Sequence, residues 1–182
     1  MNRRNRSCRV GSLALLAFVA VSNVAICAEQ ELAKQILDAT GIKGGLIVHL
    51  GCGDGKLTAA LRVNESFVAH GLDSNPANVE LARQNFRSLG LGGPVTADRW
   101  DGEHLPCIDN MVNLIVAENA GRVTGTELLR ALVPNGVAYI RKDGQWEKIV
   151  KPWPKEIDEW THYLYDPSNN AVAHDSVIAP LR

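Results

Sequence analysis

The feature that most constrains the fold is a glycine-rich pentapeptide between a strand-like segment and a helical one. Residues 46–50 form a short apolar run, which is typical of a buried strand in a parallel sheet. Gly51, Gly53 and Gly55 alternate in the next five positions, and a helical pattern follows over 56–63. Glycine lets the backbone turn sharply and approach a ligand closely. The sequence therefore predicts a turn at the carboxyl end of a strand, with free amides facing an open hollow.

Strand-like and helical segments alternate through most of the chain. The predicted strands are 46–50, 67–72, 95–97, 111–117 and 137–140, and the predicted helices are 29–40, 56–63, 76–89 and 125–132. Such alternation is typical of α/β proteins with a parallel sheet covered on both faces. We expect a doubly wound, mostly parallel sheet, with the ligand crevice at the carboxyl ends of its first strands.

Local signals mark the ends of these elements. Asn75, followed by proline, is a helix N-cap, and Thr124 with Glu127 forms a capping-box pattern. Residues 134–136 (Pro-Asn-Gly) predict a turn before the fifth strand. Residues 143–144 (Asp-Gly) predict a tight antiparallel hairpin after it.

The first 28 residues have the order of a secretory signal peptide. A basic stretch with four arginines precedes an apolar run over 10–21, and small residues follow at Ala25 and Ala28. The run is shorter than the roughly 20 apolar residues of a membrane-spanning helix. We expect export to the periplasm or the outside, with an uncleaved anchor as the alternative and no stable membrane span after signal removal. The folded domain is expected over 29–150.

Residues 151–182 are predicted to be an irregular tail or a linker. Pro152 and Pro154 stop regular structure, and aromatic residues cluster between 146 and 165. The segment 160–180 resembles the junction that precedes a quinoprotein-type β-propeller in large exported bacterial proteins. That resemblance implies a C-terminal propeller domain as a partner within a longer protein.

Charge and cysteine usage exclude several classes of function. The net charge of -1 argues against a general nucleic-acid binder. The sequence has no C-x-x-C or H-E-x-x-H pattern, so no metal site is predicted. Cys52 and Cys107 would remain after signal removal. We expect them to be small buried thiols, although export makes a disulfide between them chemically possible.

The spacing of the glycines excludes one common nucleotide-binding loop and disfavours another. In a Walker loop the Gly-Lys pair is followed by serine or threonine, but Leu57 follows Lys56 here. The dinucleotide pattern G-x-G-x-x-G needs its third glycine at position 56, and that glycine arrives one residue early, at Gly55.

The pattern instead resembles the first motif of class I S-adenosylmethionine-dependent methyltransferases, which have a Rossmann-like fold. Residues 71–76 are similar to the end of that family's second strand, where an acidic residue, here Asp73, receives the ribose hydroxyls. Residues 100–106 are similar to the stretch that meets the adenine, with Asp101 as the matching residue and Asp98 as its rival. Residues 130–136 are similar to the turn before the fifth strand, so that the resemblance spans residues 29–140.

The resemblance implies a cofactor and its binding residues. The cofactor would be S-adenosylmethionine, or S-adenosylhomocysteine after transfer. The residues expected to bind it are His49, Gly51, Cys52, Gly53, Gly55, Asp73, Ser74, Asp101, Gly102 and Glu118. The acceptor would be an unknown small molecule or protein.

The sequence also departs from the family pattern. His49 stands where the family commonly has an acidic residue near the cofactor's amino group, and either a pocket role or packing in the strand is open to it. Asn113 stands where an acidic residue commonly begins the fourth strand. The family's later helix and last two strands are replaced by a hairpin, so the sheet is truncated after the fifth strand. We find no acceptor-binding segment and no paired general base, so the catalytic residues stay unknown.

Three functions are compatible with these observations. The first is methyl transfer from S-adenosylmethionine to an unknown acceptor. The second is a degenerate, non-catalytic scaffold or interaction module in an exported protein, favoured because this cofactor is made in the cytoplasm. The third is an NAD(P)-binding Rossmann domain, which Lys56 disfavours.

Overall fold

The computed structural model describes residues 28–118, 121–155, 162–164, 167–168 and 170–172. The predicted signal peptide, except for its last position, lies outside the described residues, and so does much of the predicted propeller junction. In the described ranges, no helix has both the length and the apolar character that crossing a membrane requires.

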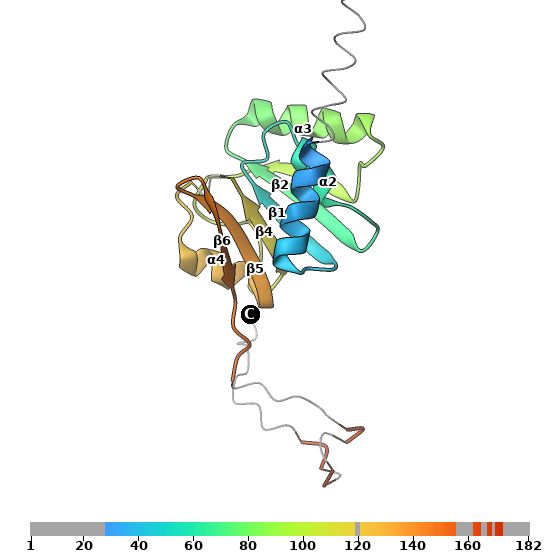
Figure 1. Ribbon diagram of the computed structural model, residues 1–182, viewed down its shortest axis with the longest axis vertical. Helices are drawn as coiled ribbons and strands as arrows, with labels where there is room; N and C mark the ends of the chain where they lie inside the picture. The colour runs from blue at the N-terminus through green and yellow to red at the C-terminus, as the bar shows by residue number, and fades with distance from the viewer. Residues whose placement is uncertain (1–27, 119–120, 156–161, 165–166, 169, 173–182) are drawn as a thin grey trace, which may run out of the picture.

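Six strands form a single sheet: β1 (Gly45–Leu50), β2 (Phe67–Asp73), β3 (Val95–Arg99), β4 (Val112–Ala117), β5 (Leu132–Lys142) and β6 (Gln145–Val150). Their order across the sheet is β3-β2-β1-β4-β5-β6 (Figure 1). The first five strands run parallel, and β6 is antiparallel to β5. The chain crosses over between β3 and β4, so the order reverses between β1 and β4, which is where doubly wound sheets bind their ligands. The predicted fold class is confirmed.

Three helices cover one face of the sheet. They are a helix over residues 28–40 (blue in Figure 1), α2 (Lys56–Leu61) and α3 (Pro76–Ser88). Phe67 of β2 packs in one buried cluster with the helix over 28–40 and α2, and Ala69 packs in another with α3. Residues two apart on a strand share a face. The three helices therefore lie on the same side.

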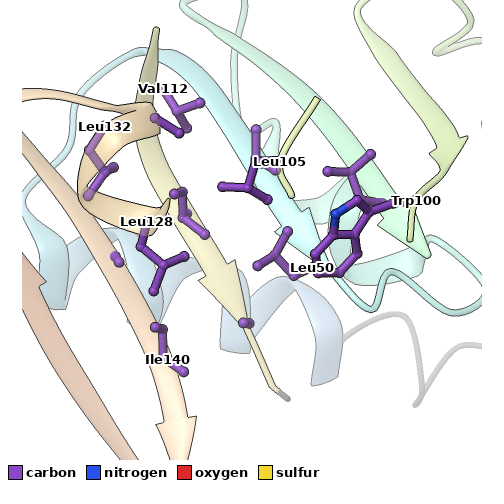
Figure 2. Close-up of a cluster of buried hydrophobic side chains, with 13 residues drawn as sticks. Leu50, Trp100, Leu105, Val112, Leu128, Leu132 and Ile140 are labelled. Carbon is purple, nitrogen blue, oxygen red and sulfur yellow. The ribbon is translucent and has the colours of Figure 1, made fainter. Parts of the chain in front are cut away.

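The opposite face is covered by α4 (Gly125–Ala131) and by an irregular segment over 100–107. Trp100 and Leu105 of that segment are buried in one cluster with Leu50 of β1 and Leu128 of α4 (Figure 2). The segment between β3 and β4 thus fills a place that a crossover helix takes in most doubly wound folds. It holds the loop after β3 close to the carboxyl end of β1.

The predicted helix caps are present in the structure. The side chain of Asn75 accepts a hydrogen bond from the amide of Ala77, at 3.0 Å, with Pro76 as the first residue of α3. The side chain of Thr124 accepts from the amide of Glu127 at 3.2 Å. Both caps satisfy amides that have no partner within their helix.

The turn predicted at residues 134–136 is instead a bulge inside β5. The register with β4 shifts there, because Val112 pairs with Leu132 whereas Leu114 pairs with Val137. Asn135 has a φ of 63°, and its amide donates to the carbonyl of residue 151. The backbone turns as predicted, but the extended structure resumes on both sides, since strand pairing begins directly after α4.

The predicted hairpin joins β5 and β6 through a two-residue turn. Asp143 and Gly144 have φ values of 51° and 81°, which is the conformation that favours an Asp-Gly pair. Tyr139 and Trp146 stack across the two strands with ring centroids 4.8 Å apart. This aromatic pair fixes the hairpin at the edge of the sheet.

Gly55 is the glycine of the turn after β1 that packs most closely against a helix. Its φ is 79°, and an added Cβ would lie 2.7 Å from a ring carbon of Phe86. A left-handed conformation costs an L-residue about 1–2 kcal/mol, and overpacking adds about 1–3 kcal/mol. We expect Gly55→Ala to lower the free energy of unfolding in urea by about 3 kcal/mol.

Gly90 offers a matched control for this variant. It also has a positive φ, 68°, but an added Cβ would meet nothing within 4 Å. Gly90→Ala should therefore lose only the conformational part, about 1 kcal/mol. Equal losses in the two variants would show that the close packing of Gly55 against α3 contributes nothing.

Candidate functional site

The glycine loop, residues 51–55, connects the carboxyl end of β1 to α2. Gly51, Gly53 and Gly55 have φ values of 71°, 53° and 79°, so all three alternating glycines adopt the left-handed conformation that glycine tolerates best. β2 and β4 flank β1, so their carboxyl ends lie on either side of the loop. The three glycines named by the sequence pattern thus shape a tight turn at the switch point of the sheet.

Asp73, the last residue of β2, lies against this loop and is only 7% exposed. Its Oδ2 accepts hydrogen bonds from the amide of Gly53 at 3.0 Å and from the side-chain amide of Asn78 at 3.1 Å. Its Oδ1 accepts from the amide of Asn75 at 2.8 Å. Two sequence motifs separated by 20 positions are therefore joined by one carboxylate.

The expectation that the loop leaves its amides free is wrong for four of the five residues. The amides of Gly51 and Cys52 donate to the carbonyl of Leu72, at 2.7 and 3.2 Å, and that of Gly55 donates to the carbonyl of Cys52 at 2.8 Å. The amide of Gly53 is held by Asp73. The loop satisfies its own backbone because it lies directly against β2, and sequence spacing does not reveal this contact.

The carboxylate of Asp73 nevertheless retains acceptor capacity. An ionised carboxylate has about four lone-pair positions, and three are used by Gly53, Asn75 and Asn78. One position is left unused by the described residues. As an acceptor, this carboxylate therefore fits one ribose hydroxyl of a nucleoside in this conformation, whereas the sequence motif predicts contact with both hydroxyls.

His49 is 2% exposed on β1, and its Nδ1 is 2.8 Å from the hydroxyl of Thr58 in α2. Burial lowers the pKa of the imidazole to about 4, against a smaller opposing effect of the Asp73 charge. The ring is therefore neutral at pH 7. Its Nε2 is buried and has no hydrogen-bond partner among the described residues. The sequence leaves open either a pocket role or packing in the strand for His49, and the contact with Thr58 supports packing against α2.

Cys52 and Cys107, the cysteines of the described part of the chain, are free thiols. Cys52 is buried against Gly71, and burial raises its pKa to about 12, with a further rise from the Asp73 charge. Cys107 is half-buried, and burial raises its pKa as well. Neither is ionised at neutral pH, so neither has the thiolate that nucleophilic or metal-binding chemistry requires.

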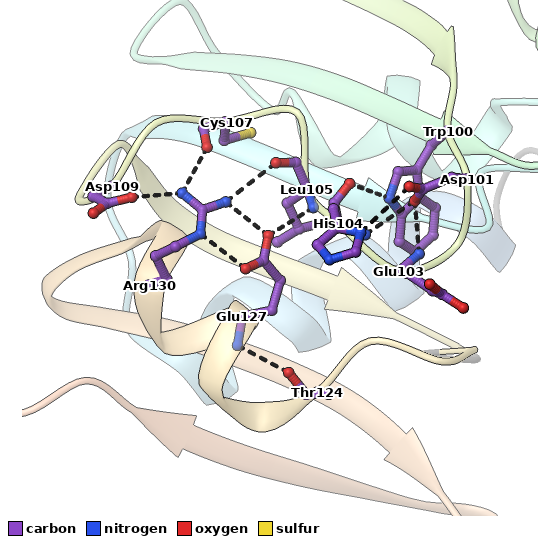
Figure 3. A network of polar contacts seen from close by, with 10 residues as sticks. All are labelled: Trp100, Asp101, Glu103, His104, Leu105, Cys107, Asp109, Thr124, Glu127 and Arg130. Atoms are coloured by element: carbon purple, nitrogen blue, oxygen red, sulfur yellow. Dashed lines mark hydrogen bonds and ion pairs between the residues drawn. The ribbon is translucent and has the colours of Figure 1, made fainter.

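Asp98 and Asp101, the two candidates for contact with the adenine, have different partners in the structure. Asp101 lies in the loop after β3, where its Oδ1 accepts from the amides of Glu103 and His104 at 2.8 and 3.0 Å (Figure 3). These backbone hydrogen bonds lower its pKa. Asp98, still on β3, is paired with Arg83 of α3. Asp98 is thus bound to a helix, whereas Asp101 holds the backbone of the loop after β3.

Arg122 ties the loop after β4 to the loop after β3, and the sequence motifs did not identify it. Its guanidinium is 2.8 Å from a carboxylate oxygen of Glu103 and donates to the carbonyl of Asp101 at 3.3 Å. The backbones approach closely, because a Cβ added to Gly121 would lie 3.8 Å from the carbonyl oxygen of Gly102. The sequence offers only one signal for this contact, which is a basic residue soon after the fourth strand.

A second arginine fixes the segment before β4. Arg130 of α4 donates to both carboxylate oxygens of Glu127 and to the carbonyls of Cys107 and Leu105 (Figure 3). Glu127 in turn accepts from the amide of Leu105 at 2.8 Å, and Arg130 lowers the pKa of its carboxyl. The capping-box pattern thus locates Glu127 correctly but misses its main role, which is to anchor the segment that buries Trp100.

The remaining predicted site residues lie around the same edge. Ser74 is exposed directly after β2, Gly102 has a φ of 89° in the loop after β3, and Glu118 is exposed at the end of β4. Glu29, which the motifs did not identify, belongs here too. Its pKa is raised first by burial and then by the charges of Glu118 and Asp54. The first turn of the helix over 28–40 therefore lies near the loop.

The buried His49 predicts a pH-dependent stability. Its pKa is about 4 in the fold and about 6.5 in an unfolded chain, so the unfolded state binds the proton more tightly. Stability due to the neutral ring is complete above pH 6.5 and falls as the pH drops toward 4. Between pH 7 and 4.5 the wild type should lose about 2–3 kcal/mol more than His49→Gln in urea unfolding. Parallel curves for the two proteins would contradict a buried, neutral imidazole.

Residues 47–144 match the family described as "Methyltransferase domain". A ubiquinone/menaquinone biosynthesis C-methyltransferase from Klebsiella pneumoniae is 26% identical over 148 residues, which cover 76% of this chain and 58% of that protein. The chain thus spans less than two thirds of the length of such curated relatives.

Solved structures show the same fold. A protein from Methanococcus maripaludis, described as an S-adenosyl-L-methionine-dependent methyltransferase, superposes with a TM-score of 0.58 at 21% identity, covering 76% of this chain and 67% of its own. A geranyl diphosphate methyltransferase in complex with SAM gives 0.55 at 19% identity, covering 61% and 48%. The family match spans more than half of the 182 residues and includes both the glycine loop and Asp73, and on that basis the chain belongs to the methyltransferase domain family.

Proposed function

We propose that the domain binds S-adenosylmethionine at the carboxyl edge of the sheet and that it transfers the methyl group to an acceptor. The observation that carries this proposal is the Asp73 carboxylate held against the amide of Gly53, with one lone-pair position left for a hydroxyl. The family match and the methyltransferases of similar fold, one of them in complex with SAM, support the same cofactor.

Different residues around the loop would contact different parts of the cofactor. Asp73 would accept a ribose hydroxyl, and the left-handed glycines of the loop would allow close approach of the backbone. Asp101 and Gly102, held by the Arg122 contact, would border the base. When bound, S-adenosylmethionine supplies an activated methyl group for in-line displacement by the acceptor. The chain's own contribution would be to hold the two reactants in line, which can supply much of such an acceleration.

The acceptor is proposed only as a class, a small molecule or a protein. The Klebsiella pneumoniae relative is a C-methyltransferase of ubiquinone/menaquinone biosynthesis, but its similarity covers 58% of its length. Near the loop, the Cys52 thiol and the His49 ring are both buried and neutral at pH 7. We therefore expect the acceptor to bring its own nucleophile rather than be activated by either group.

A second candidate function is a non-catalytic scaffold that keeps the methyltransferase fold. The observation that favours it is that four of the five loop amides are already hydrogen-bonded within the protein. Such a loop is stable without a ligand. Export would favour the same function, since the cofactor is made in the cytoplasm.

The methyltransferase proposal predicts a measurable affinity for the product of transfer. In calorimetry of the full chain, S-adenosylhomocysteine should bind, and Asp73→Ala should weaken binding at least tenfold, about 1.4 kcal/mol. Asp73→Asn keeps the size of the side chain and serves if the alanine variant unfolds. Asp98→Asn is the control, because that carboxylate is paired with Arg83 away from the loop. No heat up to millimolar ligand would favour the scaffold, and binding of NADH instead would favour an NAD(P)-binding domain.

We also propose that residues 1–28 export the chain and that a β-propeller domain follows it in a longer protein. The support is the basic stretch followed by the apolar run over 10–21, and the resemblance of 160–180 to a propeller junction. When the protein is expressed in a Gram-negative bacterium, it should appear in the periplasmic fraction with the mass of a chain that begins at Glu29. Full-length protein confined to the cytoplasm would contradict export.

A further inference from the structure

A groove separates the helix over residues 28–40 from α2, on the face of the sheet that carries three helices. It encloses a cavity of about 820 Å³, and a second cavity of about 370 Å³ lies on the other side of α2. Both are lined by Gln30, Ala59 and Ala60. None of the residues 51–55 lines either cavity, and Glu29, which lies near the loop, lines only the smaller one, so the larger groove does not include the proposed cofactor site.

The floor of the groove is apolar. Leu37, Ala59 and Phe67 line it from the helix over 28–40, α2 and β2, and Val63 beside them is 53% exposed. α2 is short and presents alanines at this point, which leaves space between its neighbours. An exposed apolar floor of this kind favours an apolar ligand group, since covering it removes apolar surface from water.

Positive charge gathers around this floor. Lys34, Lys43 and Arg62 line the first cavity, whose lining contains one carboxylate, that of Asp38. Within the described part of the chain, none of the three cations has an ion-pair partner within 4.0 Å. Three cations against one carboxylate make a local excess of positive charge around the groove.

Arg62 supplies the most specific observation. Its Nε is buried, and no acceptor for it is present among the described residues. A buried N–H without an acceptor is costly, and nearly all such groups in native proteins find one. Arg62 as a whole is half-buried and lines the cavity, and a guanidinium binds carboxylate and phosphate groups through two parallel hydrogen bonds, so an anionic group at this end of the groove would pair with it.

We infer that the groove binds a small molecule with an apolar body and a single anionic head, a carboxylate or a phosphate monoester. The head would pair with Arg62, with Lys34 and Lys43 adding charge, and the body would cover Val63 and the alanines of α2. The inference does not depend on the proposed methyltransferase function, because it uses no residue of the glycine loop and no contact of Asp73.

The test compares amphiphiles of equal chain length on the full 182-residue chain. Decanoate and decyl phosphate, each below its micelle concentration, should bind in calorimetry, and whichever binds more tightly identifies the head group. Decyltrimethylammonium carries the same apolar body with a positive head and should bind at least tenfold more weakly. Equal binding of the cationic amphiphile would overturn the inference. So would binding of inorganic phosphate as tight as that of decyl phosphate, since the apolar floor would then contribute nothing.

Substitutions place the binding on the groove. Arg62→Gln should weaken decanoate binding at least tenfold, whereas Arg87→Gln, which removes an exposed arginine paired with Glu80 on α3, should leave it unchanged. If Arg62→Gln fails to fold, Val63→Asp adds a negative charge at an exposed position and should weaken binding by a similar factor. Asp73→Asn should have no effect on decanoate, which separates this site from the proposed cofactor site. Wild-type affinity in both groove variants would overturn the inference.

Discussion

The hydrogen bond between the Gly53 amide and the Asp73 carboxylate is the contact on which the site depends. It joins the turn after β1 to the end of β2, and the same carboxylate also holds the start of α3 through its N-cap Asn75 and through Asn78 in its first turn. Hydrogen bonds to a charged acceptor are stronger than neutral ones, and this carboxylate is almost entirely buried. One side chain therefore sets the shape of the loop and keeps one acceptor position that the described residues do not use.

The loops after β3 and β4 depend on arginines rather than on glycines. Arg130 and Glu127 anchor the segment that carries Trp100 and Leu105 into the core, and Arg122 joins the loop after β4 to the loop after β3. An irregular segment can take the place of a helix here for two reasons. Its apolar side chains are buried in the core, and its backbone is hydrogen-bonded to charged side chains. The positions of Asp101 and Gly102 are thus determined by residues distant in sequence.

Local patterns were sufficient for the strands, the helices and the parallel order of the sheet. Alternation of apolar runs and amphipathic segments is a short-range property, as are the N-cap at Asn75 and the hairpin turn at Asp143. The motifs also paired Asp73 with the glycine loop. Local patterns do not reveal contacts between distant segments. These contacts are the hydrogen bonds that the loop amides make within the protein, the hydrogen bond from Arg122 to the loop after β3, and the approach of Glu29 to the glycine loop. For the same reason the local pattern at residues 134–136 predicts a turn, whereas the structure has a bulge there.

Binding of a nucleoside ligand between the glycine loop and the end of β2 is the central proposal. The most direct measurement is a titration of the isotope-labelled protein with S-adenosylhomocysteine, followed by the backbone amide resonances. The largest shifts should fall on residues 51–55, 73–75 and 101–104, with that of Gly53 among them, because its amide reports on the Asp73 carboxylate. Shifts confined to other parts of the sheet, or none at saturating ligand, would contradict this proposal.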